Sequence, residues 1–279
     1  MKQTQPNPKM RNPYQPPQTA DTPKTPDPRL HQSRLSAMSE PEAVCVTICT
    51  PAYAHLRDEA VAAFRKHFGL PVLVIECADS EGYETKMKLD LLVGPRKMVF
   101  CDLDFRPVRS FPPVWQSGNW CAVRDHGHKH PKSFASYDIE AHGLDALSYF
   151  NSGFFCCDLS KPQHAAVFAT SRVIWRDVQQ GKRPPVGDFG DQFYLNAAVR
   201  ELGIPLSLLP VSMNWLRGYA EHGMFPYVPR VIYAIHAAGV PLAGKLQHLR
   251  VMEEAHGYAA AELCDSVARE HLALSVELA

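Results

Sequence analysis

The segment KMVFCDLDFRP, residues 97–107, carries two carboxylates one residue apart at the end of an apolar run. In an extended chain, residues i and i+2 project to the same side, so Asp102 and Asp104 would point together while Leu103 faces away. Two carboxylates held close together repel each other unless a cation lies between them, and hard ions such as Mg²⁺ and Mn²⁺ take oxygen ligands. The pair predicts a metal site, and an ordinary solvent-exposed turn is the alternative.

A third group with ligand chemistry, His236, ends the apolar run RVIYAIHA, residues 230–237, and small residues follow it. A turn of small residues lets a ligand approach the backbone closely. An imidazole beside two carboxylates suits Mn²⁺ somewhat better than Mg²⁺. The alternative for this histidine is a place in the core, where a backbone carbonyl satisfies the ring.

Alternating strand-like and helix-like segments that begin at residue 42 must position these groups. The β-branched run at 43–50, the helical spacing of apolar residues at 56–68 and the apolar run at 71–76 predict a β-α-β unit with parallel strands. Further strands are expected at 97–104, 120–125, 150–159, 204–210 and 230–237, and helices at 84–93, 161–180, 190–203 and the C-terminus. The expected fold is one α/β domain over residues 42–279, with helices on both faces of its sheet.

The strand ends indicate where a ligand would bind. In sheets of this kind ligands collect beyond the C-terminal ends of the strands. The residues expected at or near such ends are Thr50, Pro51, Asp102, Asp104, Asp125 and His236. The sequence therefore predicts a site along one edge of the sheet.

The composition excludes several classes of partner. Among 279 residues, Lys plus Arg and Asp plus Glu number 29 each, so no general field attracts nucleic acid or an anionic membrane surface. No stretch approaches the roughly 18 consecutive apolar residues of a transmembrane helix. The eight cysteines fall mostly inside apolar runs without a CxxC spacing, which favours reduced, buried thiols and a cytoplasmic setting.

Residues 1–41 differ from the rest of the chain. This stretch is rich in proline and contains no Val, Ile, Phe, Trp or Cys. Such a composition cannot bury enough apolar surface to offset the entropy of ordering, so we expect a disordered tail. Its mild excess of basic residues would allow contact with a partner.

Six short segments occur in an order that carries a family resemblance. They are FCDLDF (100–105), AVRD (122–125), FNSGFFCCDL (150–159), GDQFYLN (190–196), LLPVSMNW (208–215) and AIHAAG (234–239). Together, over roughly residues 43–250, they resemble nucleotide-sugar glycosyltransferases with the GT-A fold, and in particular the glycogenin and bacterial galactosyltransferase group called family 8. The resemblance implies a single GT-A domain with a Rossmann-like mixed sheet.

The resemblance also implies a role for each matched position. Asp102, Asp104 and His236 look like the ligands of a Mn²⁺ (or Mg²⁺) ion that holds the diphosphate of a nucleotide-sugar donor, usually a UDP-sugar. Leu103 and Gly239 would lie among the donor-binding residues beside them. The nucleoside would bind at the end of the first strand, along Thr50, Pro51, Ala52 and Tyr53.

The sugar of the donor has its own set of matched residues. Asp125 matches an acid that binds the sugar hydroxyls, and the turn beneath the sugar is matched by Asn151, Ser152 and Gly153. Asp191 and Gln192 match the pair beside the anomeric carbon. Such family members transfer the sugar with retention of configuration.

The chemistry of sugar transfer agrees with these roles. Negative charge grows on the diphosphate as the glycosidic bond breaks, and a bound dication stabilises it as a Lewis acid. Positive charge grows on the sugar ring at the same time, and Asp191 with the amide of Gln192 would stabilise or orient that face. We therefore expect Asp191, Gln192 and Asp125 to be the catalytic group.

The sequence departs from the family pattern at three places. The family often has H-x-x-G-x-x-K-P-W, but here HAAGVPLAGK places Lys245 six residues after Gly239 without the Pro-Trp. We expect Lys245 to reach the diphosphate across a longer loop. The basic residue before D-x-D is either Lys86 or Lys88, and both are also compatible with exposed helix positions. Phe193 stands where the family often has a second aspartate.

Three other hypotheses compete with this one. The histidines of HGHKH, residues 126–130, with Cys121 and His142 nearby, suggest zinc, but the lack of a partner CxxC favours a polar loop that borders the acceptor. The D-x-D segment also resembles the first motif of a haloacid-dehalogenase-type phosphatase, in which the first Asp attacks phosphate. That motif normally has Thr or Val where Arg106 stands. The third hypothesis is a catalytically silent module that binds nucleotide sugars.

The acceptor does not follow from the sequence. Acceptor pockets in such folds are made by variable loops, and a fold does not by itself fix a function. A glycan, a lipid and a protein all remain compatible with the residues above.

Overall fold

The computed structural model of the chain describes residues 42–126, 139, 142–186, 190–216, 218–219 and 228–257. The chain divides into two units, Met1–Glu40 and Pro41–Ala279. The predicted tail, the histidines of HGHKH beyond His126 and the C-terminal stretch beyond residue 257 lie outside the described residues. The tail and its partner contact therefore stay predictions.

The centre of the second unit is a six-stranded mixed sheet with the order β2-β1-β3-β6-β5-β7. Its strands are β1 (Ala43–Cys49), β2 (Val72–Glu76), β3 (Lys97–Cys101), β5 (Trp120–Arg124), β6 (Phe150–Asp158) and β7 (Leu206–Leu209). β1, β2 and β3 are parallel, β7 is parallel to β5, and β6 runs antiparallel to both β3 and β5. The start of β6 therefore lies at the C-terminal ends of its two neighbours.

A second, three-stranded sheet has the order β4-β9-β8. Its strands are β4 (Phe105–Pro107), β8 (Trp215–Leu216) and β9 (Ala234–His236). β4 pairs antiparallel with β9, and Phe105 stands opposite His236. This sheet connects the D-x-D segment directly to the histidine that the sequence predicted as its partner.

The prediction of one extended strand over 97–104 was wrong. β3 ends at Cys101, and the chain turns through Asp102 and Asp104 before it enters β4 in the other sheet. The N–H of Phe105 donates to the carbonyl of Asp102 at 3.0 Å and closes the turn. Phe105 lies after the turn and is still apolar, because its ring packs in the core and stacks on Phe154 with centroids 4.9 Å apart. The apolar pattern of the sequence therefore does not show where β3 ends.

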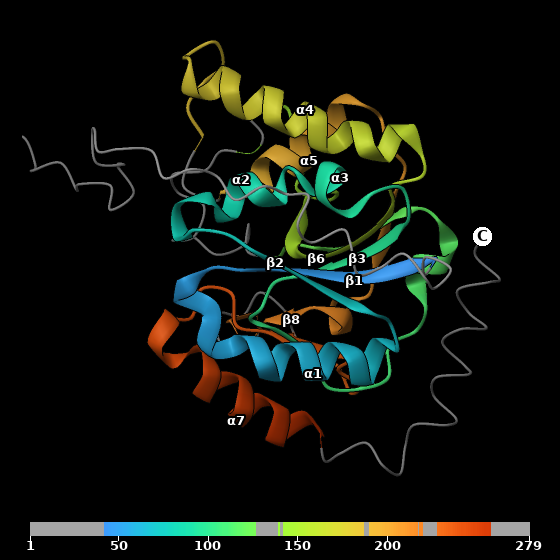
Figure 1. Cartoon of the computed structure of the whole chain (residues 1–279), viewed down its shortest axis with the longest axis vertical. Helices are drawn as coiled ribbons and strands as arrows, with labels where there is room; N and C mark the ends of the chain where they lie inside the picture. The colour runs from blue at the N-terminus through green and yellow to red at the C-terminus, as the bar shows by residue number, and fades with distance from the viewer. Residues whose placement is uncertain are drawn as a thin grey trace, which may run out of the picture. The chain divides into compact units, whose positions relative to one another are not determined.

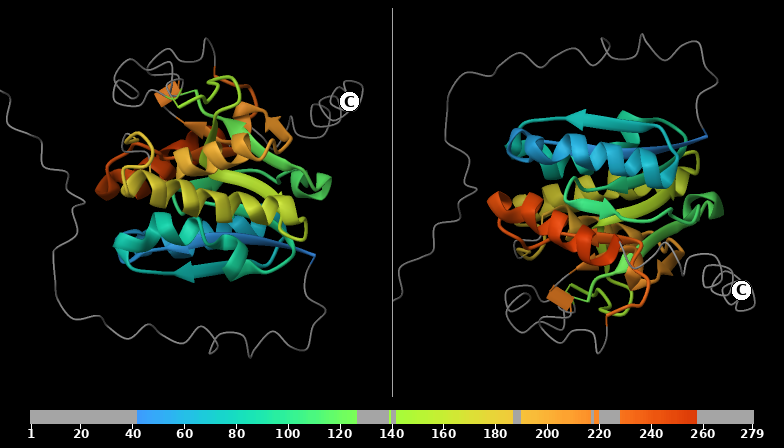
Figure 2. Two further views of the ribbon diagram at one scale, coloured as in Figure 1. Left: turned by 90° about the horizontal axis from the view of Figure 1, so that it is seen from above. Right: turned by 90° about the horizontal axis from the view of Figure 1, so that it is seen from below.

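Helices cover both faces of the large sheet, as predicted (Figure 1). On one side lie α2 (Gly82–Lys86), α3 (Leu89–Val93), α4 (Pro162–Gln179) and α5 (Asp191–Glu201), and on the other α1 (Arg57–Phe68) and α7 (Lys245–Gly257). Figure 2 shows α4 from above and α1 with α7 from below. The single helix predicted over 84–93 is two short helices, because the chain breaks at residues 87–88, where Arg172 binds the carbonyl of Met87 and the carboxylate of Asp90.

Short 3-10 helices connect several of these elements. They are η2 (Pro51–Leu56), η3 (Asp79–Glu81), η4 (Val114–Ser117), η6 (Val211–Met213) and η7 (Leu242–Gly244). η2 follows β1 directly, so residues 51–53 lie at the C-terminal end of the first strand as predicted.

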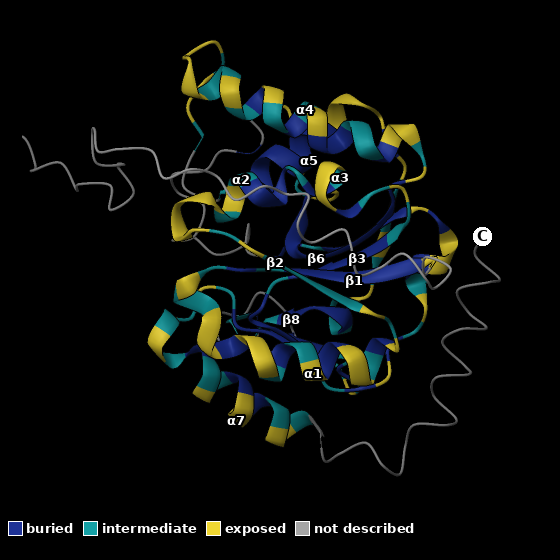
Figure 3. Ribbon diagram, in the orientation of Figure 1, coloured by how far each residue is buried: buried dark blue, intermediate teal, exposed yellow. Residues whose placement is uncertain are grey.

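The apolar residues form two clusters, one on each side of the large sheet. The first packs under α1 and α7, and the second under α4 and α5. α5 is buried from Asp191 to Val199, and its ribbon is dark blue in Figure 3. Leu202, inside the helix predicted over 190–203, follows the end of α5 and is 40% exposed.

The cysteines and the helix lengths agree with the composition. The seven cysteines in the described part of the chain are free thiols, and all but Cys77 are buried. No helix in that part of the chain is long and apolar enough to cross a membrane.

Candidate functional site

The predicted site residues come together at one edge of the large sheet. Asp102 follows β3, Asp125 follows β5, and Asn151 to Gly153 begin β6, whose direction brings them to the same edge. α5 starts there with Asp191, and β9 ends there with His236. The residues that the strand ends predicted for one site therefore do lie together at one edge of the sheet.

Asp102, Asp104 and His236 form a compact group. One ligand atom from each residue lies within 4.8 Å of the other two. Nε2 of His236 is 3.3 Å from Oδ1 of Asp104, and the N–H of Ala237 donates to the carbonyl of Asp104 at 2.9 Å. Asp104 and His236 are buried, whereas the side chain of Asp102 keeps 33% of its surface exposed. The group is therefore open to a ligand on the side of Asp102.

Gly153 lets the backbone of β6 pack closely against this group. A Cβ atom at residue 153 would lie 2.2 Å from Cε1 of His236 and 2.9 Å from Oδ2 of Asp102. Any side chain there would collide with both, so only glycine lets β6 approach so closely. Two carboxylates and one imidazole whose ligand atoms lie within 4.8 Å of one another fit a hard divalent cation such as Mn²⁺.

Two buried lysines hold the outer oxygens of the aspartates. Nζ of Lys86 lies 3.0 Å from Oδ1 of Asp102 and 2.9 Å from Oδ2 of Asp191. Nζ of Lys245 lies 2.5 Å from Oδ2 of Asp104 and also donates to the carbonyl of Ala237 at 2.7 Å. Each of Asp102 and Asp104 therefore gives one oxygen to a lysine and keeps its other oxygen for a ligand.

The lysine positions resolve two questions left by the sequence. Lys86, and not Lys88, is the basic residue at the D-x-D segment, because Lys88 pairs with Glu84 on the surface at 2.6 Å. Lys245 reaches the site in spite of its longer loop, since η7 folds back and places it at the start of α7.

These contacts shift the pKa values of the buried groups. Burial alone would lower the pKa of Lys86, but Asp102 and Asp191 raise it above its usual value. Burial alone would raise the pKa of Asp104, but His236 and Lys245 hold it well below its usual range. Burial raises the pKa of Asp102, and the charges of Asp104 and Asp191 add to this effect while Lys86 opposes it. Asp104 is therefore the more firmly ionised of the two aspartates.

A second polar group lies next to the first. Gln192 accepts from the N–H of Ser152 at 3.1 Å and donates through Nε2 to Oδ2 of Asp125 at 2.7 Å. The hydroxyl of Ser152 donates to Oδ2 of Asp191 at 2.6 Å. Asp191 is the first residue of α5, where the helix dipole stabilises a negative charge. This group can present a carboxylate and an amide to a bound sugar.

The predicted nucleoside segment is held by a residue that the sequence analysis missed. The carboxylate of Asp79 accepts from the N–H of Ala52 at 2.9 Å and from the hydroxyl of Thr50. The ring of Tyr53 has its centroid 5.8 Å from Nζ of Lys245. Asp79 follows the end of β2, so the strand-end rule that selected the other residues would also have found it.

The remaining predicted residues lie at the edges of the site. The side chain of Leu103 is packed in the core at 2% exposure, so only its main chain can contact a ligand. Gly239 has a φ of 78° in the turn after β9, a conformation that favours glycine. Phe193 is buried against His142 and Tyr194 and belongs to the core.

Tyr219 is a further neighbour that the sequence analysis missed. Its Oη lies 3.5 Å from Oδ1 of Asp125 and accepts from the N–H of His126 at 3.3 Å. It follows a short strand of the second sheet, and no strand-end or spacing signal in the sequence marks it.

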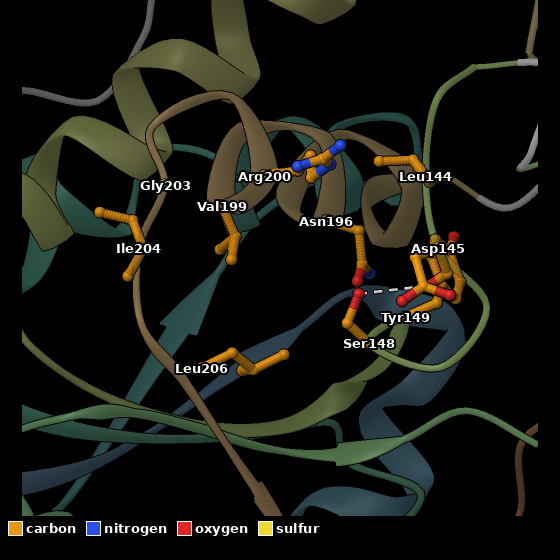
Figure 4. Close-up of a pocket in the computed structure, with 10 residues that line it drawn as sticks. All are labelled: Leu144, Asp145, Ser148, Tyr149, Asn196, Val199, Arg200, Gly203, Ile204 and Leu206. Carbon is orange, nitrogen blue, oxygen red and sulfur yellow. Dashed lines mark hydrogen bonds between the residues drawn. The ribbon is translucent and has the colours of Figure 1, made fainter.

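A cavity of about 260 Å³ lies on the other side of α5 (Figure 4). Its lining includes Leu144, Tyr149, Val199 and Ile204, and none of the metal-binding candidates. Asn196 connects it to the site, since this side chain bonds both backbone groups of Phe150 and the carbonyl of Gln192. The cavity thus backs the second polar group and is separate from the acid and histidine cluster.

The comparisons with known proteins give a fold. No protein-family model matches the sequence, and a search of curated proteins finds no match. Solved structures do match. The galactosyltransferase LgtC, in complex with donor and acceptor sugar analogues, has a TM-score of 0.52 and 15% identity over 76% of this chain and 96% of its own.

Two further structures agree with the first. The bifunctional glycosyltransferase WbbM has a TM-score of 0.55 and 14% identity over 74% of this chain and 47% of its own. The glycosyltransferase GlyE of Streptococcus pneumoniae TIGR4, in its apo form, has a TM-score of 0.51 and 13% identity over 77% of this chain and 63% of its own. The fold that the six segments predicted is confirmed: the chain has the fold of the GT-A glycosyltransferases.

Proposed function

We propose that the protein is a metal-dependent glycosyltransferase that moves a sugar from a nucleotide-diphosphate sugar, a UDP-sugar, to an acceptor with retention of configuration. The observation that carries this proposal is the meeting of Asp102, Asp104 and His236 around one space, within a glycosyltransferase fold. The second polar group lies directly beside that space. LgtC, which shares the fold, was solved with donor and acceptor sugar analogues.

The charges of the site support a dication. The two polar groups contain four carboxylates, from Asp102, Asp104, Asp125 and Asp191, and two ammonium groups, from Lys86 and Lys245. The difference is two negative charges, which one divalent cation balances. Burial is the largest cause of the raised pKa of Asp102, and the carboxylates of Asp104 and Asp191 add to it.

Each group would have its own task in the transfer. Asp102, Asp104 and His236 would hold the Mn²⁺ ion, which would supply Lewis-acid stabilisation to the diphosphate as negative charge develops there. Lys245, beside Asp104, is placed to add a positive charge at the same end of the donor. Asp191 would face the growing positive charge of the sugar ring, and Nζ of Lys86 lies 2.9 Å from its Oδ2.

The second polar group would orient the donor sugar. The N–H of Ser152 fixes the amide of Gln192, and the amide in turn fixes the carboxylate of Asp125. Because these side chains are buried and hydrogen-bonded before any ligand arrives, they need little reorganisation when charge develops. Asp125 would bind sugar hydroxyls, as the resemblance implies.

The two other functions fit the structure less well. A phosphatase of the haloacid-dehalogenase type would use Asp102 as a nucleophile, but Lys86 and Asp104 flank this carboxylate in a glycosyltransferase fold. A silent binding module would have no need of Asp191 and Gln192 in a prepared arrangement. A cytoplasmic setting stays a prediction that rests on the free cysteines.

A turnover assay tests the proposal. The protein is incubated with Mn²⁺ and a panel of nucleotide sugars, and release of the nucleoside diphosphate is measured by chromatography. We expect slow donor hydrolysis or transfer that needs Mn²⁺. Metal-dependent nucleotide binding without turnover would favour the silent module, and cleavage of p-nitrophenyl phosphate without nucleotide binding would favour the phosphatase.

A further inference from the structure

A row of buried polar side chains connects the backbone of β6 to the ring of His236. The N–H of Gly153 donates to Oδ1 of Asn151 at 3.0 Å. Nδ2 of Asn214 donates to the same oxygen at 3.0 Å, and Oδ1 of Asn214 lies 3.0 Å from Nδ1 of His236. Asn214 is completely buried, and Asn151 is 6% exposed. Water is therefore excluded from every contact in this row.

The direction of each hydrogen bond in the row follows from the backbone N–H of Gly153, where the row begins. A backbone N–H can only donate, so Asn151 must turn its carbonyl oxygen toward Gly153. That oxygen is then the acceptor for Asn214, which must present its NH₂ group. The carbonyl of Asn214 consequently faces the imidazole, so Nδ1 of His236 must carry a proton.

The proton on Nδ1 determines what the other nitrogen can do. In a neutral imidazole with Nδ1–H, Nε2 carries a lone pair. Here Nε2 points toward Asp104 and lies 3.3 Å from Oδ1. With Nδ1 protonated, Nε2 is the ring nitrogen that can bind a cation held between the imidazole and that carboxylate. The row of amides thus prepares His236 as a metal ligand.

We propose that Asn214 is a positioning residue for the metal, because it fixes the Nδ1–H tautomer and the ring orientation of His236. The inference rests on the proposed metal-dependent function and adds a residue to it. Asn214 follows η6 and precedes β8, whose pairing with β9 places it beside the histidine. Hydrogen-bond partners of this kind typically change metal affinity by about 10–100-fold when they are removed.

The chain contains a natural reference for the tautomer. His164 accepts from the backbone N–H of Asp158 through Nδ1 at 3.1 Å, so its Nδ1 has no proton. Nitrogen NMR of metal-free protein labelled with ¹⁵N-histidine can compare the two rings in one sample, and the variant His236→Gln assigns the signal. We expect a proton on Nδ1 of His236 and none on Nδ1 of His164. A His236 ring without a proton on Nδ1 would overturn the proposal whatever the variants do.

Two variants separate the hydrogen bond from packing. Asn214→Leu has nearly the same volume but removes the acceptor, and we expect its affinity for Mn²⁺ to fall by about 10–100-fold in calorimetry. Asn214→Asp keeps an acceptor for Nδ1–H, and its affinity should stay within about tenfold of the wild type. Unchanged affinity in Asn214→Leu would contradict the proposal.

The two measurements distinguish a failure of this inference from a failure of the proposed function. If the wild-type protein bound no Mn²⁺, the metal site itself would fail. The position of the proton on His236 would then still decide whether Asn214 fixes the tautomer.

Discussion

The two halves of the site hold their carboxylates in different ways. In the group of Asp102, Asp104 and His236, called the metal half below, each aspartate contacts the ammonium group of a lysine. In the second polar group, called the sugar half below, the neutral amide of Gln192 donates to Asp125. Asp191 accepts from the hydroxyl of Ser152 and also contacts a lysine. Lys86 belongs to both halves. The difference fits the proposed function, in which one half would accept a cation and the other would orient neutral hydroxyl groups.

The largest expected effect comes from breaking the metal half. Asp104→Asn keeps the size of the side chain but removes the more firmly ionised carboxylate, so both Mn²⁺ affinity and donor turnover should fall, turnover by about 10³-fold. Calorimetry and chromatography measure the two. Asp145→Asn, an exposed aspartate at the separate cavity, is the matched control and should behave as the wild type. Wild-type turnover in Asp104→Asn would rule out the proposed metal site.

Breaking the sugar half should separate chemistry from metal binding. In Gln192→Glu, the oxygen that replaces Nε2 would face Oδ2 of Asp125 at the 2.7 Å of the present hydrogen bond. The two carboxylates would repel each other, and we expect turnover to fall by about 10²-fold while Mn²⁺ affinity stays near the wild-type value. A parallel loss of Mn²⁺ affinity would mean that the two halves do not act separately.

Lys86 and Lys88 form a matched pair that tests the bridge between the halves. Lys86→Met leaves Asp102 and Asp191 without their buried cation, and we expect the free energy of unfolding to fall by about 3–5 kcal/mol. Lys88→Met loses only an exposed pair with Glu84, which contributes less than about 1 kcal/mol. Urea unfolding of both proteins measures the difference. Equal stabilities would show that the bridge is not important for folding.

The smallest expected effect concerns how stability depends on pH, and it tests a residue outside the site. His67 lies on α1, far from both halves in sequence, and burial with the nearby charge of Lys66 lowers its pKa to about 4. Between about pH 6.5 and pH 4 the unfolded chain therefore binds a proton that the folded chain does not, so stability decreases as the pH falls through this window.

The variant His67→Gln cannot take up that proton. We expect its loss of stability between pH 7.5 and pH 5, measured by urea unfolding, to be smaller than that of the wild type. An unchanged loss would assign the acid sensitivity to other groups, including those of the site.

Particular residues show what the sequence could and could not predict. The ends of apolar runs located Thr50, Asp102, Asp125 and His236 at one edge, because strand ends follow from local composition. The reversed direction of β6, which brings Gly153 to that edge, depends on pairing with both β3 and β5 and has no local signal.

Other parts of the site depend on long-range contacts in the same way. Lys86, and not Lys88, contacts the D-x-D segment because the fold buries Lys86 against Asp102 and leaves Lys88 on the surface with Glu84. The contact joins residues more than a dozen positions apart, so local sequence does not reveal it. Asn214 lies in the segment LLPVSMNW (208–215), but its hydrogen bonds to Asn151 and His236 join residues far apart in the sequence. The D-x-D turn was mistaken for extended chain because Phe105 continues the apolar run in another sheet.

The pairing of β4 with β9 has a consequence for how the site forms during folding. It joins Phe105 to His236, so it closes a long loop that includes β5, β6, α4 and α5. Contacts of such large sequence separation form slowly, since the loop loses entropy before the contact is gained. During synthesis His236 leaves the ribosome after the six strands of the large sheet, and the nascent chain therefore lacks the third ligand until late. A metal that binds only the closed arrangement would then favour completion of the second sheet by mass action.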